Sequence, residues 1–534
     1  VTPGDEPDVD NYDACYLPDG RIVYASTACY QGVPCVAGSD SVANLCIMNA
    51  DGSGVRQLCF DQDHDWSPAV LNNGRVLYTR WEYSDLPHSN SRMLFHMNPD
   101  GSGQMEYYGS NSYWPHSLFY ARPIPGHPGQ FAGIVSGHHG VTRMGELVLF
   151  DIERGRRESQ GAIQRIPGYG KGVDWGGSLN QDSPLIADNL VDASWPKFLH
   201  PWPLGGGYIL TACKPEPDAL WGLYLVDTFD NITLIHEEPG QALFEPIPVQ
   251  PIPRPVVLQD HVNLAEKHGR VKVVDIYEGP GLAGVPRGTV KSLRLMTYSF
   301  AYRGMGSETD RVGFDGPWDV VRIMGSVPVE PDGSAYFEVP ANTPISLQPL
   351  DAQGRAVQLM RSWLTVMPGE LQSCSGCHEP QNSSIGSTRR MQAMERPPSQ
   401  IQPWYGPERG VAVGSGAPGE LQLGGSDCGG AQHAHHHGSV RTDGDDLRTG
   451  PPPDSVIARF GSRGRYPEEG AGAPGAVRDE AVASRREPAA SAEGDDRGLG
   501  GLARLRPYDG HSWSVVDGFE LEEAGPDGSV RDDC

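Results

Sequence analysis

Two cysteines and a histidine in the segment Cys374-Ser-Gly-Cys377-His378 have the types and spacing that attach a c-type haem. Thiols three positions apart can form thioethers with the two vinyl groups of one haem, and the adjacent imidazole then reaches the iron. The alternative is half of a zinc site, but zinc usually takes four ligands and the chain has no second Cys-x-x-Cys pair. The sequence therefore predicts one covalent haem c on Cys374 and Cys377, with His378 as the iron ligand.

The ligand on the other face of the iron decides what this haem can do. A second strong ligand favours electron transfer, whereas an open position lets small nitrogen or oxygen compounds bind. Apart from His378, no histidine lies between His268 and His433. Methionines are more often core residues than ligands, and those near the motif are Met360, Met367, Met391 and Met394. We therefore expect a five-coordinate or water-bound, high-spin iron.

The acidic segment Asp61-Gln-Asp63-His64-Asp65 is a candidate site for an additional metal ion. Carboxylate oxygens are the ligands that hard cations prefer. A solvated turn explains the same residues, and it is the interpretation that we favour from the sequence.

Histidines form two further candidate groups. His138 and His139 lie in a Gly-flanked loop, where they can line a channel mouth, hold a metal, or simply bond to neighbouring strands. A histidine-rich tract would be metal-binding on composition alone, but it has no meaning if the chain is out of frame there; it consists of His433, His435, His436 and His437.

The pairing of the remaining N-terminal cysteines stays open. Cys29 and Cys35 flank a short Gly-Pro loop and can form a disulfide in an oxidising compartment. Cys46 and Cys59 fit equally well as small buried thiols on strands. The set without an assigned pairing is Cys15, Cys29, Cys35, Cys46, Cys59 and Cys213.

Internal repeats determine the expected fold of the first half. One motif occurs as Leu17-Pro-Asp-Gly-Arg-Ile-Val-Tyr24 and Leu71-Asn-Asn-Gly-Arg-Val-Leu-Tyr78, and another as Ile47-Met-Asn-Ala-Asp-Gly-Ser-Gly54 and His96-Met-Asn-Pro-Asp-Gly-Ser-Gly103. Each copy combines an apolar strand with an Asp-Gly or Asn-Gly turn, which indicates a hairpin. A period of roughly 40–55 residues with several strands per unit is typical of propeller blades. Weaker echoes at 147–151 and 223–227 bring the blades visible in the sequence to four, and the turn resembles the TolB-like propeller repeat.

A Pro-rich stretch, 244–255, ends the repeat region and predicts an extended linker, because proline cannot occupy a central strand. A small β-rich domain follows, with a hairpin expected at Asp332-Gly333. Its predicted strands are Val271–Tyr277, Val290–Ala301, Val320–Val329 and Ser334–Val339.

The composition changes sharply at about Val411. All 12 Met lie before this point, and residues 411–534 contain neither Lys nor Asn. Such a segment buries too little apolar surface to order itself. A G/C-rich message read out of frame explains the missing residue types as well, so we expect a disordered or out-of-frame tail.

Charge and hydropathy limit the partners. A formal charge of −26 argues against nucleic acid and is compatible with docking to a basic redox protein. No run of about 18 apolar residues occurs, so no membrane span is expected. The chain starts at Val1 without an apolar leader, which we interpret as a mature or truncated N-terminus.

One known family shares residue patterns spread over about 12–410. The segments are Phe60–Pro68, Tyr78–Tyr83, Gly137–Gly140, Ser194–His200, Asp315–Asp319, Pro340–Ile345 and Met360–Glu370. They resemble the hydrazine synthase alpha-subunit-like family of extracytoplasmic multidomain cytochromes. The resemblance implies a mainly β chain, with a six-bladed TolB-like propeller over 1–250 and a β-rich middle domain with one c-type haem over 251–410. In the family a C-terminal domain with a second haem usually follows, whereas the composition here predicts the disordered or out-of-frame tail, 411–534. It also implies a periplasmic or otherwise extracytoplasmic location.

The sequence departs from that family at two positions. A second Cys-x-x-Cys-His usually follows the segment Trp404-Tyr-Gly-Pro407, and none occurs here. Hydrazine-forming members are expected to place a haem-ligating Tyr four residues after the motif His, where this chain has Asn382. Hydrazine synthesis is therefore not expected.

Two functions follow from these observations. In the first, the chain is a cytochrome that transfers electrons, or performs redox chemistry on a small nitrogen compound, together with a redox partner protein. In the second, the propeller is an interaction scaffold and the haem is structural or vestigial.

Overall fold

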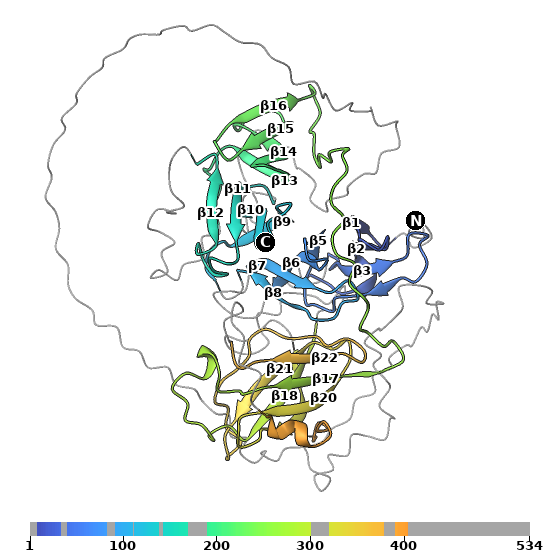
Figure 1. Ribbon diagram of the computed structural model, residues 1–534, viewed down its shortest axis with the longest axis vertical. Helices are drawn as coiled ribbons and strands as arrows, with labels where there is room; N and C mark the ends of the chain where they lie inside the picture. The colour runs from blue at the N-terminus through green and yellow to red at the C-terminus, as the bar shows by residue number, and fades with distance from the viewer. Residues whose placement is uncertain are drawn as a thin grey trace, which may run out of the picture. The chain divides into compact units, whose positions relative to one another are not determined.

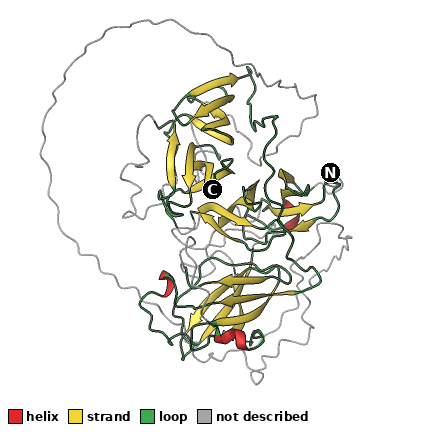
Figure 2. Cartoon of the chain, in the orientation of Figure 1, coloured by secondary structure: helices red, strands yellow, loops and turns green. Residues whose placement is uncertain are grey.

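The computed structural model describes residues 8–33, 40–82, 91–109, 112–137, 143–168, 189–300, 320–378 and 390–403, all of them within one compact unit. The regular secondary structure of the described residues is almost entirely β-strand, and its helices are three short 3₁₀ turns (Figure 2). These turns are η1 (Thr27–Cys29), η4 (Pro280–Leu282) and η5 (Gln392–Glu395). None of the helices there has the length and apolar character needed to cross a bilayer.

Four four-stranded antiparallel meanders make up the first half of the described chain (Figure 1). The first contains β1 (Asn11–Tyr16), β2 (Ile22–Ser26), β3 (Asn44–Met48) and β4 (Arg56–Gln57). The second contains β5 (Asp65–Val70), β6 (Val76–Glu82), β7 (Ser91–Met97) and β8 (Met105–Tyr108). The third contains β9 (Ser117–Pro123), β10 (Gln130–Ser136), β11 (Glu146–Asp151) and β12 (Ala162–Ile166). The fourth contains β13 (Lys197–Gly205), β14 (Tyr208–Lys214), β15 (Gly222–Asp227) and β16 (Ile232–His236).

Each meander has the strand order of a propeller blade, and one parallel pair, Arg92 with Ser117, links the second meander to the third. The mainly β class and the blade-like repeat are thus as predicted. The closed, six-bladed ring stays a prediction.

The sequence repeats occupy equivalent turns of the first two meanders. Residues 17–21 and 71–75 join the first strand to the second, and residues 49–55 and 98–104 join the third to the fourth. In the latter pair, the N–H of Asn49 donates to the carbonyl of Ser53 and that of Asn98 to the carbonyl of Ser102, both at 2.8 Å. The same local hydrogen bonds in both copies explain why the sequence repeats there.

No described residue between β16 and β17 belongs to a strand, as the Pro-rich stretch predicts. The linker between these strands, residues 237–267, contacts turns of the first two meanders in its C-terminal half. The guanidinium of Arg21 forms two 2.8 Å hydrogen bonds to Asp260, and Asp100 accepts from the N–H groups of His261 and Val262.

Two three-stranded sheets form the β-rich domain. One has the order β20-β17-β22 and the other β19-β18-β21, and apolar side chains from both sheets share one core. The strands are β17 (His268–Val273), β18 (Ser292–Ser299), β19 (Val320–Pro328), β20 (Ala335–Pro340), β21 (Ile345–Leu350) and β22 (Leu371–Cys374).

The hairpin expected at Asp332-Gly333 is wrong, although the turn itself is present. The N–H of Glu330 donates to the carbonyl of Ser334 at 2.8 Å, but β19 pairs with β18 while β20 pairs with β17. A local turn signal cannot distinguish a hairpin from a crossing between two sheets, because strand pairing depends on distant residues. The predicted strand from Val271 to Tyr277 also ends early, at Val273.

Candidate functional site

The Cys-x-x-Cys-His motif begins at the last residue of β22. This strand pairs in parallel with β17, so that Cys374 lies beside Val273. Beyond the strand, the N–H of Val274 donates to the carbonyl of Cys374 at 2.9 Å, and that of Asp275 to Ser375 at 3.1 Å. Beyond Cys374, the backbone of the motif thus continues the hydrogen bonding of the sheet although it no longer belongs to a strand.

A second pair of backbone hydrogen bonds holds the other end of the motif. The N–H of Cys377 donates to the carbonyl of Glu278 at 2.8 Å, and the N–H of Gly281 donates to the carbonyl of Cys377 at 3.0 Å. Segment 274–281 therefore binds the motif at both cysteines.

Gly376 is required by this close contact. A Cβ atom at position 376 would collide with the carbonyl oxygen of Glu278 and with its side chain. Of the two residues between the cysteines, Gly376 is thus fixed by packing.

Asp275, whose N–H donates to the carbonyl of Ser375 in the motif, is itself fixed by an ion pair. Asp275 is fully buried, and its carboxylate accepts from Arg287, with 3.0 Å between Nη1 and Oδ1. Because a buried carboxylate needs a partner, this ion pair stabilises the backbone to which Ser375 is bonded.

The side chains of the motif fit a c-type haem. Cys374 and Cys377 are half-buried against the core of the two-sheet domain, and His378 is exposed with a left-handed backbone (φ 60°). Two half-buried sulfurs and one exposed imidazole on a single loop are the donor set for two thioethers and one axial nitrogen. The haem itself and the roles of Cys374, Cys377 and His378 stay predictions.

The nearby methionines differ in burial. Met367 is fully buried and packs beside Gly101, with 3.2 Å between its sulfur and the ideal Cβ position of that glycine. Met394 is 45% exposed, and Met360 and Met391 are partly exposed. The burial of Met367 agrees with the view that methionines here fill the core.

The acidic segment Asp61–Asp65 is buried, so the solvated turn favoured by the sequence is wrong. Asp61, Asp63 and Asp65 are all 0% exposed, and His64 is 9% exposed. The imidazole Nδ1 of His64 accepts from the N–H of Ala43 at 3.0 Å, and the ring stacks on Trp66 with centroids 4.5 Å apart. The sequence pattern resembled a turn because it is polar, but its partners come from distant segments.

A buried ion-pair network connects this segment to β6 and to the residues that precede β22. Arg80 lies 3.4 Å from Asp61 and 2.8 Å from Glu82. The indole N–H of Trp363 donates to Asp61 at 2.6 Å, and the hydroxyl of Ser362 donates to Glu82 at 2.8 Å. The guanidinium of Arg80 also lies over the Trp363 ring, 4.5 Å from its centroid.

Sequence reasoning missed Arg80 and Glu82 as members of this network. The available signal was a pair of charged residues within β6, whose side chains are all buried. Buried charges are rare unless they are paired. Two opposite charges in one buried strand therefore indicate a polar network.

Burial also changes the ionisation of this segment. Loss of solvation raises the pKa of Asp65 well above its usual value, and the nearby Asp61 carboxylate raises it further. Loss of solvation lowers the pKa of His64 well below its usual value, with Arg143 and Arg92 acting in the same direction. Asp65 therefore favours its protonated form and His64 its neutral form.

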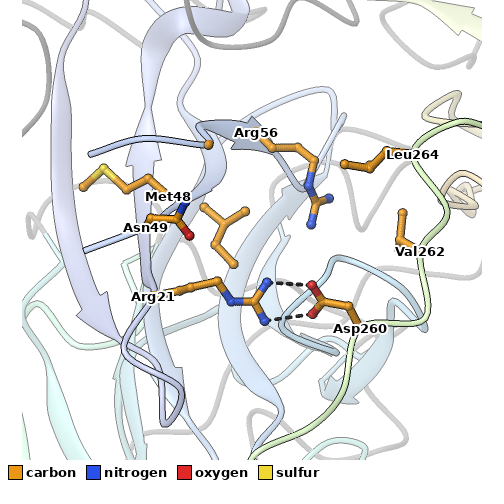
Figure 3. Close-up of a pocket in the computed structure, with 9 residues that line it drawn as sticks. Arg21, Met48, Asn49, Arg56, Asp260, Val262 and Leu264 are labelled. Atoms are coloured by element: carbon orange, nitrogen blue, oxygen red, sulfur yellow. Dashed lines mark hydrogen bonds and ion pairs between the residues drawn. The ribbon is translucent and has the colours of Figure 1, made fainter. Parts of the chain in front are cut away.

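A pocket of ≈ 190 Å³ lies between the first meander and the linker (Figure 3). It contains the guanidinium groups of Arg21 and Arg56. Arg21 is already bonded to Asp19 and Asp260, and Arg56 donates to the carbonyl of Asp100 at 3.0 Å. Because existing contacts engage both cations, the pocket is not an evident anion site.

Several sequence-predicted residues lie outside the described residues. They are Cys35, His138, His139, Asn382 and the histidine tract at 433–437. The disulfide between Cys29 and Cys35 therefore stays a prediction. Cys46 and Cys59 are buried, as the alternative of core cysteines requires, although only Cys46 lies on a strand; Cys213 is buried as well.

A comparison with known families matches a part of the β-rich domain. Residues 288–379 match the model of the "Hydrazine synthase alpha subunit middle domain". The matched range includes β18 to β22 and the complete Cys-x-x-Cys-His motif. This match confirms the resemblance predicted from the sequence.

A solved structure supports the fold over a larger part of the chain. Hydrazine synthase of Kuenenia stuttgartiensis superposes with a TM-score of 0.54 and 15% identity, over 70% of this chain and 54% of that one. This chain thus spans about half the length of the relative. A TolB protein of Agrobacterium tumefaciens matches with a TM-score of 0.28 and 9% identity, over 44% of this chain and 68% of that one. A comparison with curated proteins gives no match.

Proposed function

Because residues 288–379 are related to the middle domain of the hydrazine synthase alpha subunit, we propose that this chain is an extracytoplasmic c-type cytochrome. It carries one covalent haem c, attached to Cys374 and Cys377 and ligated by His378. The blade-like meanders belong to a six-bladed propeller that precedes the haem domain.

The observation that carries this proposal is the geometry of the motif. Its backbone is held by hydrogen bonds at both cysteines, while the imidazole of His378 is exposed. A structural thiol pair needs no exposed histidine at the next position. An attached haem needs fixed sulfurs and an imidazole that can reach iron.

When bound, the haem supplies a one-electron redox couple. The residues of the chain would orient it: hydrogen bonds to segment 274–281 hold the backbone of both cysteines, and the exposed His378 would ligate the iron. The Asp275–Arg287 ion pair holds the backbone below the loop. The class of reaction is electron transfer or redox chemistry on a small nitrogen compound, with a redox protein as partner.

Hydrazine formation is not part of the proposal. Asn382 occupies the position at which a haem-ligating Tyr is expected in hydrazine-forming members, and an amide is a poor ligand for iron. Because no histidine other than His378 lies between His268 and His433 either, we expect no strong second ligand, and a bound haem iron would be high-spin.

Optical and EPR spectra of the holoprotein, recorded with and without carbon monoxide or hydroxylamine, test this coordination. We expect a high-spin ferric signal and a Soret band that shifts when either compound is added. A low-spin spectrum that is indifferent to both would make the chain a plain electron carrier with two strong axial ligands.

A second candidate function, an interaction scaffold, is favoured by the outer edge of the fourth meander. β16 pairs only with β15 among the described strands, and Leu234 and Ile235 on it are 46% and 47% exposed. Exposed apolar side chains on an edge strand favour pairing with a partner. Rapid electron exchange with a donor cytochrome supports the first function, whereas a haem that no physiological reductant reaches supports the second.

A further inference from the structure

Three potential metal ligands meet inside the blade region, far along the chain from the haem motif. One ligand atom from each of Cys59, Asp61 and Asp65 lies within 4.8 Å of the other two. All three residues are 0% exposed. A thiol and two carboxylates are therefore enclosed together without access to bulk solvent.

Each carboxylate uses one oxygen for neighbouring side chains. Oδ1 of Asp61 accepts from Trp363 at 2.6 Å and lies 3.4 Å from Arg80, and Oδ2 of Asp65 accepts from Asn44 at 3.1 Å. The other two oxygens, Oδ2 of Asp61 and Oδ1 of Asp65, are buried and have no hydrogen-bond partner in the described part of the chain. Buried carboxylate oxygens without a partner are costly, and they call for a proton or a cation.

Charge balance points in the same direction. Two carboxylates this close cannot both ionise at low cost, and Arg80 is shared between Asp61 and Glu82. A divalent cation would replace the proton and satisfy both oxygens at once.

We propose that Cys59, Asp61 and Asp65 bind a structural zinc ion. Thiolate with carboxylate suits the borderline-soft Zn²⁺, whereas Ca²⁺ and Mg²⁺ take oxygen ligands only. Three protein ligands leave the fourth tetrahedral position to water or to a neighbouring hydroxyl. The site is independent of the haem.

Zinc at this position would fix the segment that receives Trp363. Asp61 would contact the ion through one oxygen and the indole of Trp363 through the other. The ion would therefore hold in place the Asp61 carboxylate that accepts the hydrogen bond of Trp363, which lies in the segment before β22.

The test is the zinc content of the purified full-length holoprotein after incubation with zinc chloride and gel filtration. The histidine tract can bind zinc by itself, so the experiment uses a background in which it is removed. The background substitutions are His433→Ala, His435→Ala, His436→Ala and His437→Ala. Iron is quantified in the same mass-spectrometric measurement and reports the haem separately.

Cys59→Ser and Asp65→Asn remove one ligand each with little change in volume. We expect the zinc content to fall from about one ion per chain to near zero in both variants. Cys213→Ser is the matched control, since Cys213 is a buried free thiol on a different sheet. Zinc that survives Cys59→Ser, or is lost equally in Cys213→Ser, overturns the proposal.

X-ray absorption at the zinc edge of the background protein needs none of the ligand variants and so does not depend on their folding. One sulfur at about 2.3 Å and oxygens at about 2.0–2.2 Å are expected. A first shell without sulfur, a shell dominated by histidine, or a protein that retains no zinc would overturn the proposal.

Discussion

The Cys-x-x-Cys-His motif at 374–378, here called the haem loop, and the buried segment 59–65 hold their reactive groups in opposite ways. In the loop the backbone is fixed and the imidazole is exposed, because the hydrogen bonds of Cys374 and Cys377 run through main-chain atoms. In the buried segment the side chains themselves are the structural contacts, and Asp61 bonds both Arg80 and Trp363. Spacing in the sequence is therefore informative about the first region, whereas burial decides the chemistry of the second.

Removing a thiol from the haem loop tests the first half of this comparison and has the largest expected effect. Cys374→Ala should weaken or abolish covalent haem attachment, because one of two thioethers is lost. His378→Ala should keep the covalent haem and lose the proximal bond. Mass spectrometry of the denatured chain, together with the pyridine haemochrome spectrum, measures both. Unchanged covalent haem in a Cys374→Ala, Cys377→Ala double variant would rule out this attachment site.

Removing the central cation of the buried network should strongly destabilise the fold. Arg80→Ala leaves Asp61 and Glu82 buried without their ion pair, and we expect the free energy of unfolding to fall by about 3–5 kcal/mol. Chemical denaturation monitored by tryptophan fluorescence measures the change. The control is Arg355→Ala, which breaks an ion pair with Asp351 in which Arg355 is 75% exposed; there we expect about 0–1 kcal/mol. Equal effects would mean that the buried network is no more stabilising than a surface pair.

Adding one carbon atom to the haem loop should have a smaller effect on stability. Gly376→Ala places a Cβ against the backbone of Glu278, and such overpacking costs about 1–3 kcal/mol. The thermal midpoint should fall, and so should the yield of covalent haem, because the sulfurs are displaced. A variant with normal haem content and normal stability would show that the loop is less tightly held than its hydrogen bonds indicate.

The pH dependence of stability distinguishes a shared proton from a bound metal. When a chelator has removed all metal, the pKa of Asp65 is raised in the native state. The native state then keeps a proton that the unfolded chain releases above pH ~3.8. Wild type should then lose stability relative to Asp65→Asn as the pH rises from there towards the native pKa, by at most about 1.4 kcal/mol per pH unit. With saturating zinc the sign should reverse, because the metal binds the ionised carboxylate. Denaturation curves of both proteins at several pH values, with and without zinc, give the comparison.

The sequence was most informative where the controlling interactions are local. The copies at 47–54 and 96–103 form the same turn because Asn49 and Asn98 bond residues four positions away. The Asp332-Gly333 turn was also recognisable, but its assignment to a hairpin failed, because the partners of β19 and β20 are β18 and β17. The burial of Asp61 could not be predicted from neighbours, since it depends on Trp363.

The parallel pairing of β17 with β22 has a consequence for the order in which the domain matures. Residues 274–370 separate the two strands, so the ladder beside Cys374 closes only after β18 to β21 have been synthesised. Contacts between residues so distant in sequence form slowly during folding. Once segment 274–281 has bonded to the motif, Cys374 and Cys377 are half-buried and their backbone is fixed. Under the proposed attachment of haem c, the thiols would be most accessible before the ladder closes, and the rate of closure would limit the time available for attachment.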